Sequence, residues 1–203
     1  MSAIISDELA IVIVADQSYS SYSIFLVYQL REIGYDGKIF IVTDSMLNFR
    51  QNNISKLEIT LIIQKSEAIP FQKQRHVSNF TYTKMNLAQL VPSSIRKVIY
   101  LDVDTLVFEN PVLLAEEHEI DILGAVRDFR SPQLSSYIRT TGPYFNAGLL
   151  FIDVLKFKLA IKDIDLRWIK KNTSYYQDQD ILNRLFENRW QELPEKWNTT
   201  LSF

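Results

Sequence analysis

The feature of this sequence that most constrains its fold is a continuous apolar run at residues 9–15, Leu-Ala-Ile-Val-Ile-Val-Ala. Uninterrupted runs rich in β-branched residues are typical of strands that are covered on both faces, as in parallel sheets. After a polar turn, residues 21–33 carry Ile24, Val27, Tyr28 and Ile33 near one helical stripe, and Gly34 favours a helix end. This region therefore predicts a strand followed by a helix that packs on a sheet.

The alternation of strand and helix continues along the chain. We expect further strands at residues 38–43, 57–63, 97–101, 105–108, 120–126 and 147–154, and helices at residues 72–90, 155–171 and 179–188. Strands that alternate with helices require crossover connections and form a mostly parallel sheet. Since no linker or internal repeat is visible in the 203 residues, we predict one α/β domain over residues 1–203, a mostly parallel mixed sheet flanked by helices.

The composition excludes several classes of protein. Lys and Arg number 22 against 24 Asp and Glu, a net charge of −2, whereas a nucleic-acid binder needs clustered positive charge. The chain has no Cys, which excludes disulfides, thiolate zinc sites and cysteine nucleophiles. No apolar run approaches the roughly 18 residues of a membrane span. Acidic residues precede the first run, unlike a signal peptide, so we expect a cytoplasmic protein without a transmembrane segment.

Four aspartates follow predicted strands at their carboxyl ends: Asp16, Asp102, Asp104 and Asp128. In open α/β sheets a ligand binds at this edge. One residue separates Asp102 from Asp104, and alternation in an extended chain would point both carboxylates to the same side. At about 4 Å and an effective dielectric constant of about 20, two carboxylates repel by about 4 kcal/mol. A shared proton or a bound cation relieves this repulsion, and hard oxygen ligands favour Mg²⁺ or Mn²⁺, although two solvated aspartates would give the same pattern.

Three motifs occur in order along the chain. They are residues 96–107 (Arg-Lys-Val-Ile-Tyr-Leu-Asp-Val-Asp-Thr-Leu-Val), residues 144–148 (Tyr-Phe-Asn-Ala-Gly) and residues 176–183 (Tyr-Gln-Asp-Gln-Asp-Ile-Leu-Asn). Together they resemble the retaining glycosyltransferases of family 8, which include glycogenin and bacterial lipopolysaccharide galactosyl- and glucosyltransferases. Residues 11–22 and 76–84 look like that family's nucleotide loop and the helix before its Asp-x-Asp motif. The resemblance implies a nucleotide-sugar-binding domain that is GT-A-like and Rossmann-related.

The resemblance also implies a UDP-sugar donor of galactose or glucose, Mn²⁺ (or Mg²⁺), and a glycan or glycolipid acceptor of the lipopolysaccharide type. Carried over by position, the nucleotide-binding residues are Val14, Asp16, Ser18, Lys84, Asp102 and Val103, and the metal ligands are Asp102 and Asp104. The sugar-binding residues are Asp128, Asn146, Ala147 and Asp178, and the catalytic residues are Gln179, Asp180 and Asp178. Ser18 stands where the bacterial enzymes usually have Asn, and Lys84 where they often have Arg.

The catalytic assignment follows from the chemistry of the residue that would face the reacting carbon. Gln179 is a poor nucleophile, so we expect front-side attack of the acceptor on an oxocarbenium-like species whose charge Gln179 stabilises. Asp180, its neighbour at the same helix start, is the alternative nucleophile.

One departure from the family concerns the end of the chain. The family closes its site with a His-x-x-Gly-x-x-Lys element followed by Pro-Trp, whereas this chain contains only His76 and His118, neither in such an element, and ends at Phe203. Two lost charge-assisted contacts of about 1.5–3 kcal/mol each would weaken donor binding by about two to four decades. Either the chain is a C-terminally truncated catalytic domain, or water and another segment take the place of this element. In the truncated case we expect peripheral association at the inner membrane face through the missing region.

Two alternative functions fit part of the sequence. An apolar run followed by Asp-x-Asp-x-Thr is also the signature of haloacid-dehalogenase-like phosphatases, in which Asp102 would attack phosphorus and Asp104 would act as acid and base. That motif normally ends the first strand, whereas three strands are predicted before it here, and no Gly-Asp-x-x-x-Asp motif follows. A non-catalytic nucleotide-sugar-binding domain is the second alternative, supported by the missing closing element.

Overall fold

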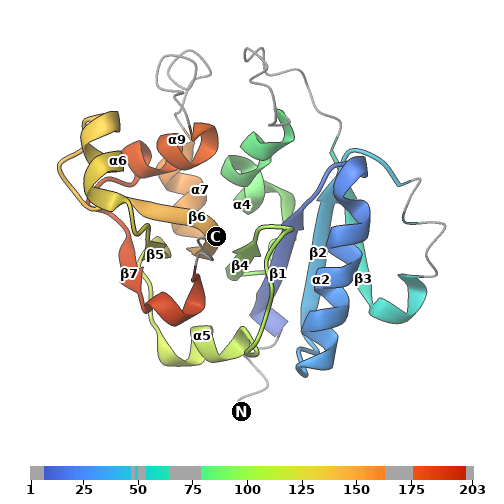
Figure 1. Ribbon diagram of the computed structural model, residues 1–203. Coiled ribbons are helices and arrows are strands. Elements are labelled where there is room, and N and C mark those ends of the chain that lie inside the picture. Colours follow the sequence, from blue (N-terminus) through green and yellow to red (C-terminus); the bar gives the residue numbers. More distant parts are fainter. Residues whose placement is uncertain (1–6, 47–48, 50–53, 65–78, 163–175, 200–203) are drawn as a thin grey trace.

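The computed structural model describes residues 7–46, 49, 54–64, 79–162 and 176–199, which form one seven-stranded sheet flanked by helices (Figure 1). The strands lie in the order β3-β2-β1-β4-β6-β5-β7. Their bounds are β1 Leu9–Val14, β2 Lys38–Thr43, β3 Ile59–Ile63, β4 Lys97–Leu101, β5 Leu123–Arg127, β6 Phe145–Asp153 and β7 Gln191–Leu193. β6 is antiparallel to both of its neighbours, whereas the other pairs are parallel. The predicted α/β fold with a mostly parallel mixed sheet is confirmed.

Helices cover both faces of the sheet, which explains the continuous apolar run of β1. Ile11 and Ile13 point to one face, where α2 (Ser20–Glu32) and α5 (Val112–Glu117) pack. Ala10 and Val12 point to the other face, which is covered by α4 (Leu87–Leu90), α7 (Val154–Ile161) and α9 (Gln177–Leu185). A smaller apolar cluster lies under α6 (Ser131–Ile138). Short 3₁₀ helices complete the described chain: η1 Gln17–Tyr19, η2 Ile54–Leu57, η3 Asn79–Asn86 and η4 Glu195–Trp197.

Several predicted elements differ in the structure. Residues 105–108 form no strand, because the chain turns directly after β4, with the Thr105 N–H donating to the Asp102 carbonyl. The predicted helix at residues 72–90 is a 3₁₀ helix over Asn79–Asn86 and α-helical only at Leu87–Leu90, while residues 72–78 lie outside the described residues. Of the helix predicted at 155–171, the structure describes α7, and residues 163–171 fall outside.

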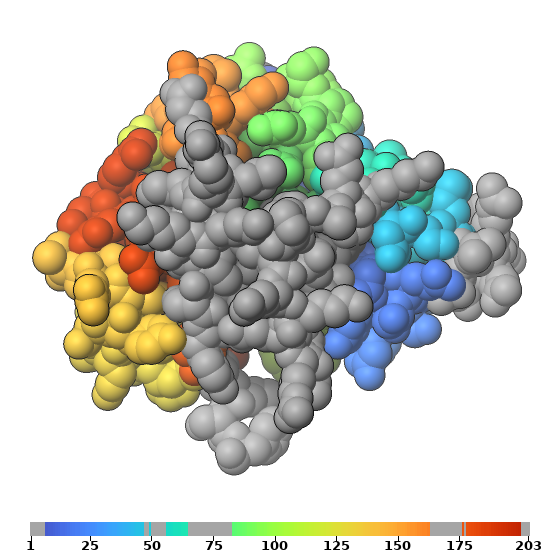
Figure 2. All heavy atoms as spheres, turned by 90° about the horizontal axis from the view of Figure 1, so that it is seen from above, coloured from blue at the N-terminus to red at the C-terminus, as the bar shows by residue number. Residues whose placement is uncertain are grey.

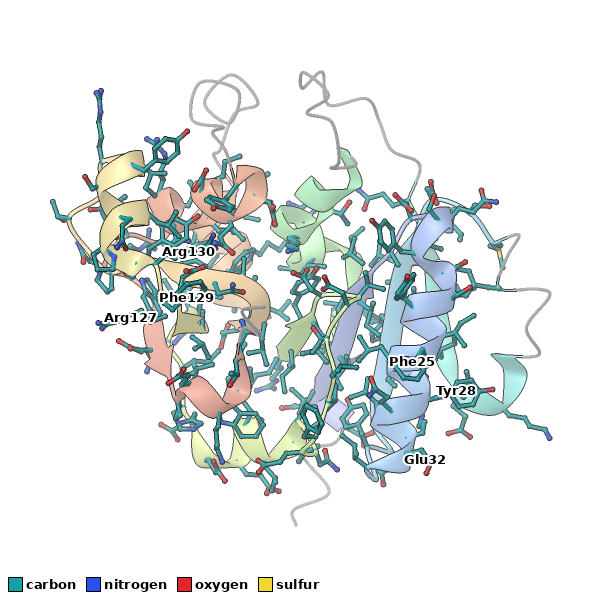
Figure 3. The ribbon with its side chains drawn as sticks, in the orientation of Figure 1. Phe25, Tyr28, Glu32, Arg127, Phe129 and Arg130 are labelled. Atoms are coloured by element: carbon teal, nitrogen blue, oxygen red, sulfur yellow. The ribbon has the colours of Figure 1, made fainter. Side chains whose placement is uncertain are left out.

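Among the α-helices and strands of the described residues, α5, α6 and β7 were not predicted. Each has at most eight residues, too short for a clear periodic pattern. The outer face of α2 also differs from expectation, because Tyr28 is 50% exposed instead of lying on the buried stripe. Phe25 and Tyr28 point away from the sheet in Figure 3. Glu58 has a left-handed backbone with φ of 50° between η2 and β3, which shortens the third strand at its start.

Candidate functional site

The topology brings the predicted site residues to one edge of the sheet. β1, β4 and β5 run in the same direction, so Asp16, Asp102 and Asp128 all follow strands at that edge. β6 runs the opposite way and therefore begins there, at Phe145 and Asn146. Figure 2 looks onto this edge, with η1 and the start of α2 in blue on one side, and α6 and α9 in yellow and red on the other.

An irregularity in β6 brings its first residues against the end of β4. The pairing of β5 with β6 jumps from Ala125 opposite Leu150 to Val126 opposite Asn146. Of the residues between, Leu149 pairs with Leu101 of β4, and the Asp102 N–H donates to the Gly148 carbonyl at 2.8 Å. A Cβ atom on Gly148 would lie 3.0 Å from Asn146 Oδ1 and 3.4 Å from Asp102 Oδ2. Glycine at this position therefore lets Asn146 and Asp102 approach each other.

Lys84 lies beneath this point as a buried cation between two acids. Its Nζ atom is 2.8 Å from Asp102 Oδ1 and 3.0 Å from Asp178 Oδ2, and it donates to the Ala147 carbonyl at 3.4 Å. Burial opposes the charged form of Lys84, but the charges of Asp102 and Asp178 outweigh it and raise the lysine pKa well above its usual value. Burial raises the pKa of Asp178, although Lys84 opposes that shift. Lys84, which was predicted to bind the nucleotide, therefore forms ion pairs with Asp102, a predicted metal ligand, and with Asp178, a predicted sugar-binding residue.

Tyr100 belongs to the same cluster and was not predicted. Its hydroxyl donates to Asp102 Oδ1, and its ring lies 4.9 Å from Lys84 Nζ. Burial, together with the charge of Asp102, raises the pKa of Tyr100 well above its usual value. Tyr100 and Asp102 are two positions apart, so alternation along β4 was a sequence signal that could have identified it.

The Asp-x-Asp segment is a turn, not the extended chain that the sequence suggested. The Thr105 N–H donates to the Asp102 carbonyl at 3.1 Å, and Val103 and Asp104 occupy the turn between them. Extended alternation therefore does not apply to the two carboxylates, which is a correction. Asp102 is half-buried, whereas Asp104 is exposed at the turn. Val103 packs against the apolar cluster that includes Ile99 and Leu101, which fixes the turn to the sheet.

The start of α9 carries three predicted site residues with different environments. Asp178 faces Lys84, as described. Gln179 accepts a hydrogen bond from the Ala147 N–H at its Oε1 atom, at 2.9 Å, and its Nε2 atom lies 3.5 Å from Asp128 Oδ2. Asp180 is completely buried and accepts from the Tyr144 hydroxyl at 2.6 Å and the Tyr176 N–H at 2.9 Å. Asp180 is thus tied into the protein interior.

Asp128 is a buried carboxylate held by its own loop. It accepts from the Arg130 N–H at 2.9 Å and from the guanidinium at both oxygens, at 3.2 Å. Arg130 also donates to the Tyr176 hydroxyl at 2.7 Å, and its hydrogen bonds to Asp128 raise the arginine pKa. Figure 3 shows Phe129 and Arg130 on the β5–α6 connection and Arg127 at the end of β5, where Arg127 pairs with Glu192. Arg130 and Tyr176 are site-forming residues that the sequence alone did not identify.

The predicted nucleotide loop lies at the end of β1. Val14 is buried at the strand end, and Asp16 Oδ1 accepts from the Ser18 N–H at 2.9 Å, which begins η1. The Gln17 N–H donates to Asp44 Oδ1 at 2.8 Å, so a second acid, from the end of β2, fixes the loop. Asp16 is half-buried and Ser18 exposed. The β1–β4 pairing places these residues at the same edge as Asp102, and no hydrogen bond joins them to it among the described residues.

An α/β sheet that gathers acids, an amide and a buried lysine at the carboxyl edge of its strands has the arrangement with which open α/β folds bind a polar ligand. Residues 10–203 match the family model of glycosyl transferase family 8, so the chain belongs to glycosyltransferase family 8.

Individual relatives agree with this membership. The chain is 36% identical over 137 residues to a putative glycosyltransferase of Haemophilus influenzae, which is 62% of this chain and 40% of that protein. It is 27% identical over 134 residues to the lipopolysaccharide 1,2-glucosyltransferase of Escherichia coli, 60% of this chain and 39% of that protein. The matches span less than half the length of these curated relatives.

Solved structures resemble this fold over most of its length. The galactosyltransferase LgtC, in complex with donor and acceptor sugar analogs, has a TM-score of 0.79 and 25% identity, and covers 92% of this chain and 74% of that one. Within the described ranges, no helix is both long enough and apolar enough to cross a membrane.

Proposed function

We propose that this chain transfers galactose or glucose, with retention of configuration, from a UDP-sugar to a glycan or glycolipid acceptor. The observation that carries the proposal is the meeting of Asp102, Asn146 and Gln179 at one edge of the sheet, because they come from three separate motifs. Membership of family 8 supports the transferase class. The names of two relatives, a lipopolysaccharide 1,2-glucosyltransferase and LgtC with donor and acceptor sugar analogs, support a hexose donor and a sugar acceptor.

The nucleotide would lie over the ends of β1 and β4. Asp16 uses its Oδ1 atom for the Ser18 N–H, so Oδ2 is the oxygen available to accept the uracil N3–H. Val14, Ser18 and Val103 would line the base and ribose. Lys84 supplies a positive charge beneath the diphosphate while it holds Asp102.

The donor atoms fit a hard divalent cation. Asp102 Oδ1 is engaged by Lys84 and Tyr100, whereas Oδ2 meets no hydrogen-bond donor among the described residues. Asp102 Oδ2 and the exposed Asp104 would hold Mn²⁺ (or Mg²⁺), because hard cations prefer carboxylate oxygens. The described residues contain no cluster of three or more potential ligands. When bound, the metal would neutralise charge on the departing diphosphate.

The hexose would lie between the start of β6 and the start of α9. Asp128, Asn146, Ala147 and Asp178 would recognise its hydroxyl groups. Gln179 Oε1 accepts from the Ala147 N–H with one lone pair, and its second lone pair is available to face a developing positive charge at the reacting carbon. Both carboxylate oxygens of Asp180 accept hydrogen bonds from the protein. This favours front-side attack with Gln179 over a covalent step at Asp180.

The test is a transfer assay with Mn²⁺, using UDP-galactose or UDP-glucose with a lipopolysaccharide-derived glycan. We expect acceptor-dependent release of UDP and a product whose anomeric configuration, followed by NMR, matches that of the donor. Binding of the donor without release of UDP would instead favour the non-catalytic binder. Because the chain belongs to family 8, the phosphatase hypothesis provides only a negative control, in which we expect p-nitrophenyl phosphate not to be hydrolysed.

A cytoplasmic location with peripheral association at the inner membrane face belongs to the same proposal, because a lipid-linked acceptor would lie there.

A further inference from the structure

A side-chain amide at the start of β6 has its orientation fixed by the backbone. Asn146 lies at the bend of β6, and one end of its amide is 2.8 Å from the Gly148 N–H. A backbone N–H can only donate a hydrogen bond, so the atom it meets must be the amide oxygen, Oδ1. This chemistry settles which end of Asn146 is oxygen and which is nitrogen.

Asn198 contributes a second donor to the same oxygen. Its Nδ2 atom lies 3.0 Å from Asn146 Oδ1, although the two residues are 52 positions apart. An amide oxygen has two acceptor positions, so Gly148 and Asn198 occupy both. Asn146 Nδ2 is left without a partner among the described residues, on a half-buried side chain.

The segment that carries Asn198 is anchored near the Asp-x-Asp turn. Asn198 follows η4, and its backbone N–H donates to the Glu195 carbonyl at 3.1 Å. Trp197 and Val103 both pack against the apolar cluster that includes Ile99 and Leu101. Asn198 Nδ2 and Asp102 Oδ2 both lie within 4 Å of the place that a Gly148 Cβ would occupy. Asn198 is therefore at the edge of the site without being part of any of the three motifs.

We propose that Asn198 is a positioning residue that determines the hydrogen-bonding polarity of the donor-sugar site. By saturating Asn146 Oδ1 together with Gly148, it leaves Asn146 to present two N–H donors. Asn146 then recognises an oxygen acceptor, a sugar hydroxyl oxygen or a diphosphate oxygen, and discriminates against a group that can only donate. This inference rests on the proposed function, because it takes Asn146 as a ligand of the donor.

The test compares two substitutions that separate polarity from packing. Asn198→Asp keeps the shape but places an acceptor against Asn146 Oδ1, whereas Asn198→Ala removes the side chain. If Asn198 acts through polarity, the KM for the UDP-sugar rises about three- to tenfold in the alanine variant and further in the aspartate variant. A packing role predicts the reverse order, with alanine the more damaging, and that order would overturn the proposal.

A double-mutant cycle excludes a direct charge effect of the new aspartate. In an Asn146→Ala background, Asn198→Ala and Asn198→Asp should each leave KM unchanged within about twofold, because their effects pass through Asn146. If KM rises as much in that background as it does with Asn146 present, Asn198 contacts the donor directly, and the positioning role is refuted. Each variant is first checked for an unchanged melting temperature, so that unfolding is not read as weak binding.

A measurement on the ligand-free protein keeps the inference separate from the proposed function. In the ¹⁵N NMR spectrum, the side-chain NH₂ signal of Asn198 should shift upfield in Asn146→Ala, and the Gly148 backbone N–H should exchange faster with solvent. Unchanged signals would show that Asn198 does not hold Asn146. If the signals change as expected but the wild-type chain transfers no hexose, the proposed function fails while the positioning of Asn146 stands.

Discussion

The buried ammonium group of Lys84 lies 2.8 Å from Oδ1 of Asp102, the first acid of the Asp-x-Asp turn. A second acid, Asp178, lies 3.0 Å from the same ammonium group on the side of α9. Lys84 therefore joins three segments distant in sequence, namely η3, the end of β4 and the start of α9. The same cation that would compensate a bound diphosphate holds the site together before any ligand arrives.

Replacing Lys84 with Met should destabilise the fold severely. Breaking a buried ion pair by removing one partner costs about 3–5 kcal/mol, because it leaves uncompensated buried charge. We expect the free energy of unfolding in urea to fall by that amount, and Lys84→Met/Asp178→Asn to recover part of it. A Met variant within about 1 kcal/mol of wild type would mean that water, not Lys84, compensates the two acids.

The pH dependence of stability should reveal Asp178. Its pKa is raised in the folded protein by burial, so this carboxyl contributes most to stability below its unfolded pKa of about 3.8, and the contribution is lost as the pH rises through the folded value. The amide of Asp178→Asn does not titrate, so this variant does not lose stability in this way as the pH rises. We therefore expect the unfolding free energy of Asp178→Asn to improve relative to wild type as the pH rises from about 3 to 7. A difference that is constant with pH would contradict the raised pKa.

Gly148→Ala should damage ligand binding more than folding. The new Cβ would lie 3.0 Å from Asn146 Oδ1 and 3.4 Å from Asp102 Oδ2, so it would push apart two proposed ligands of the donor. We expect donor KM to rise about tenfold or more, a loss of about 1.4 kcal/mol, in a steady-state assay.

Gly34→Ala is the matched control for this substitution. Gly34 has φ of 82°, and apart from its chain neighbours no atom of the described residues lies within 4 Å of the place that its Cβ would occupy, so the expected effect of alanine there is backbone strain. We expect it to lower stability by about 1–2 kcal/mol without changing KM. If both alanine variants affect KM alike, the crowding argument at Gly148 fails.

The sequence was sufficient to predict the framework of the site but not its internal contacts. β1 and β4 were predictable because a strand that is covered on both faces has a continuous apolar sequence. The burial of Lys84 was not, since it depends on acids from two other segments. The contacts of Asn198 with Asn146 and of Arg130 with Tyr176 span 52 and 46 positions, and no local pattern encodes such pairings.

Asp104→Ala should abolish Mn²⁺-dependent UDP binding if the exposed acid of the turn holds the metal. Losing one of the two proposed carboxylate ligands removes a large share of the attraction for a hard cation. Calorimetric titration of UDP with and without Mn²⁺ measures the effect. Asp121→Ala is the control, because Asp121 is an exposed acid that pairs with Lys156 away from the site. Unchanged Mn²⁺ dependence in Asp104→Ala would remove the metal role from this residue.

Arg130→Lys should impair catalysis although it preserves the charge. Arg130 contacts both oxygens of buried Asp128 and also the Tyr176 hydroxyl just before α9, a forked geometry that a lysine ammonium group cannot reproduce. With Asp128 less firmly held, we expect kcat/KM to fall about tenfold, a loss of about 1.4 kcal/mol.

Arg127→Lys provides the comparison for this prediction. Arg127 pairs with Glu192 at the surface, three residues away from Arg130, and exposed ion pairs contribute about 0–1 kcal/mol. We expect its kcat/KM to stay within about twofold of wild type. Equal losses in both variants would point to a general effect of positive charge on the β5–α6 connection, whereas a loss confined to Arg130→Lys would identify the fork that orients Asp128 toward Gln179.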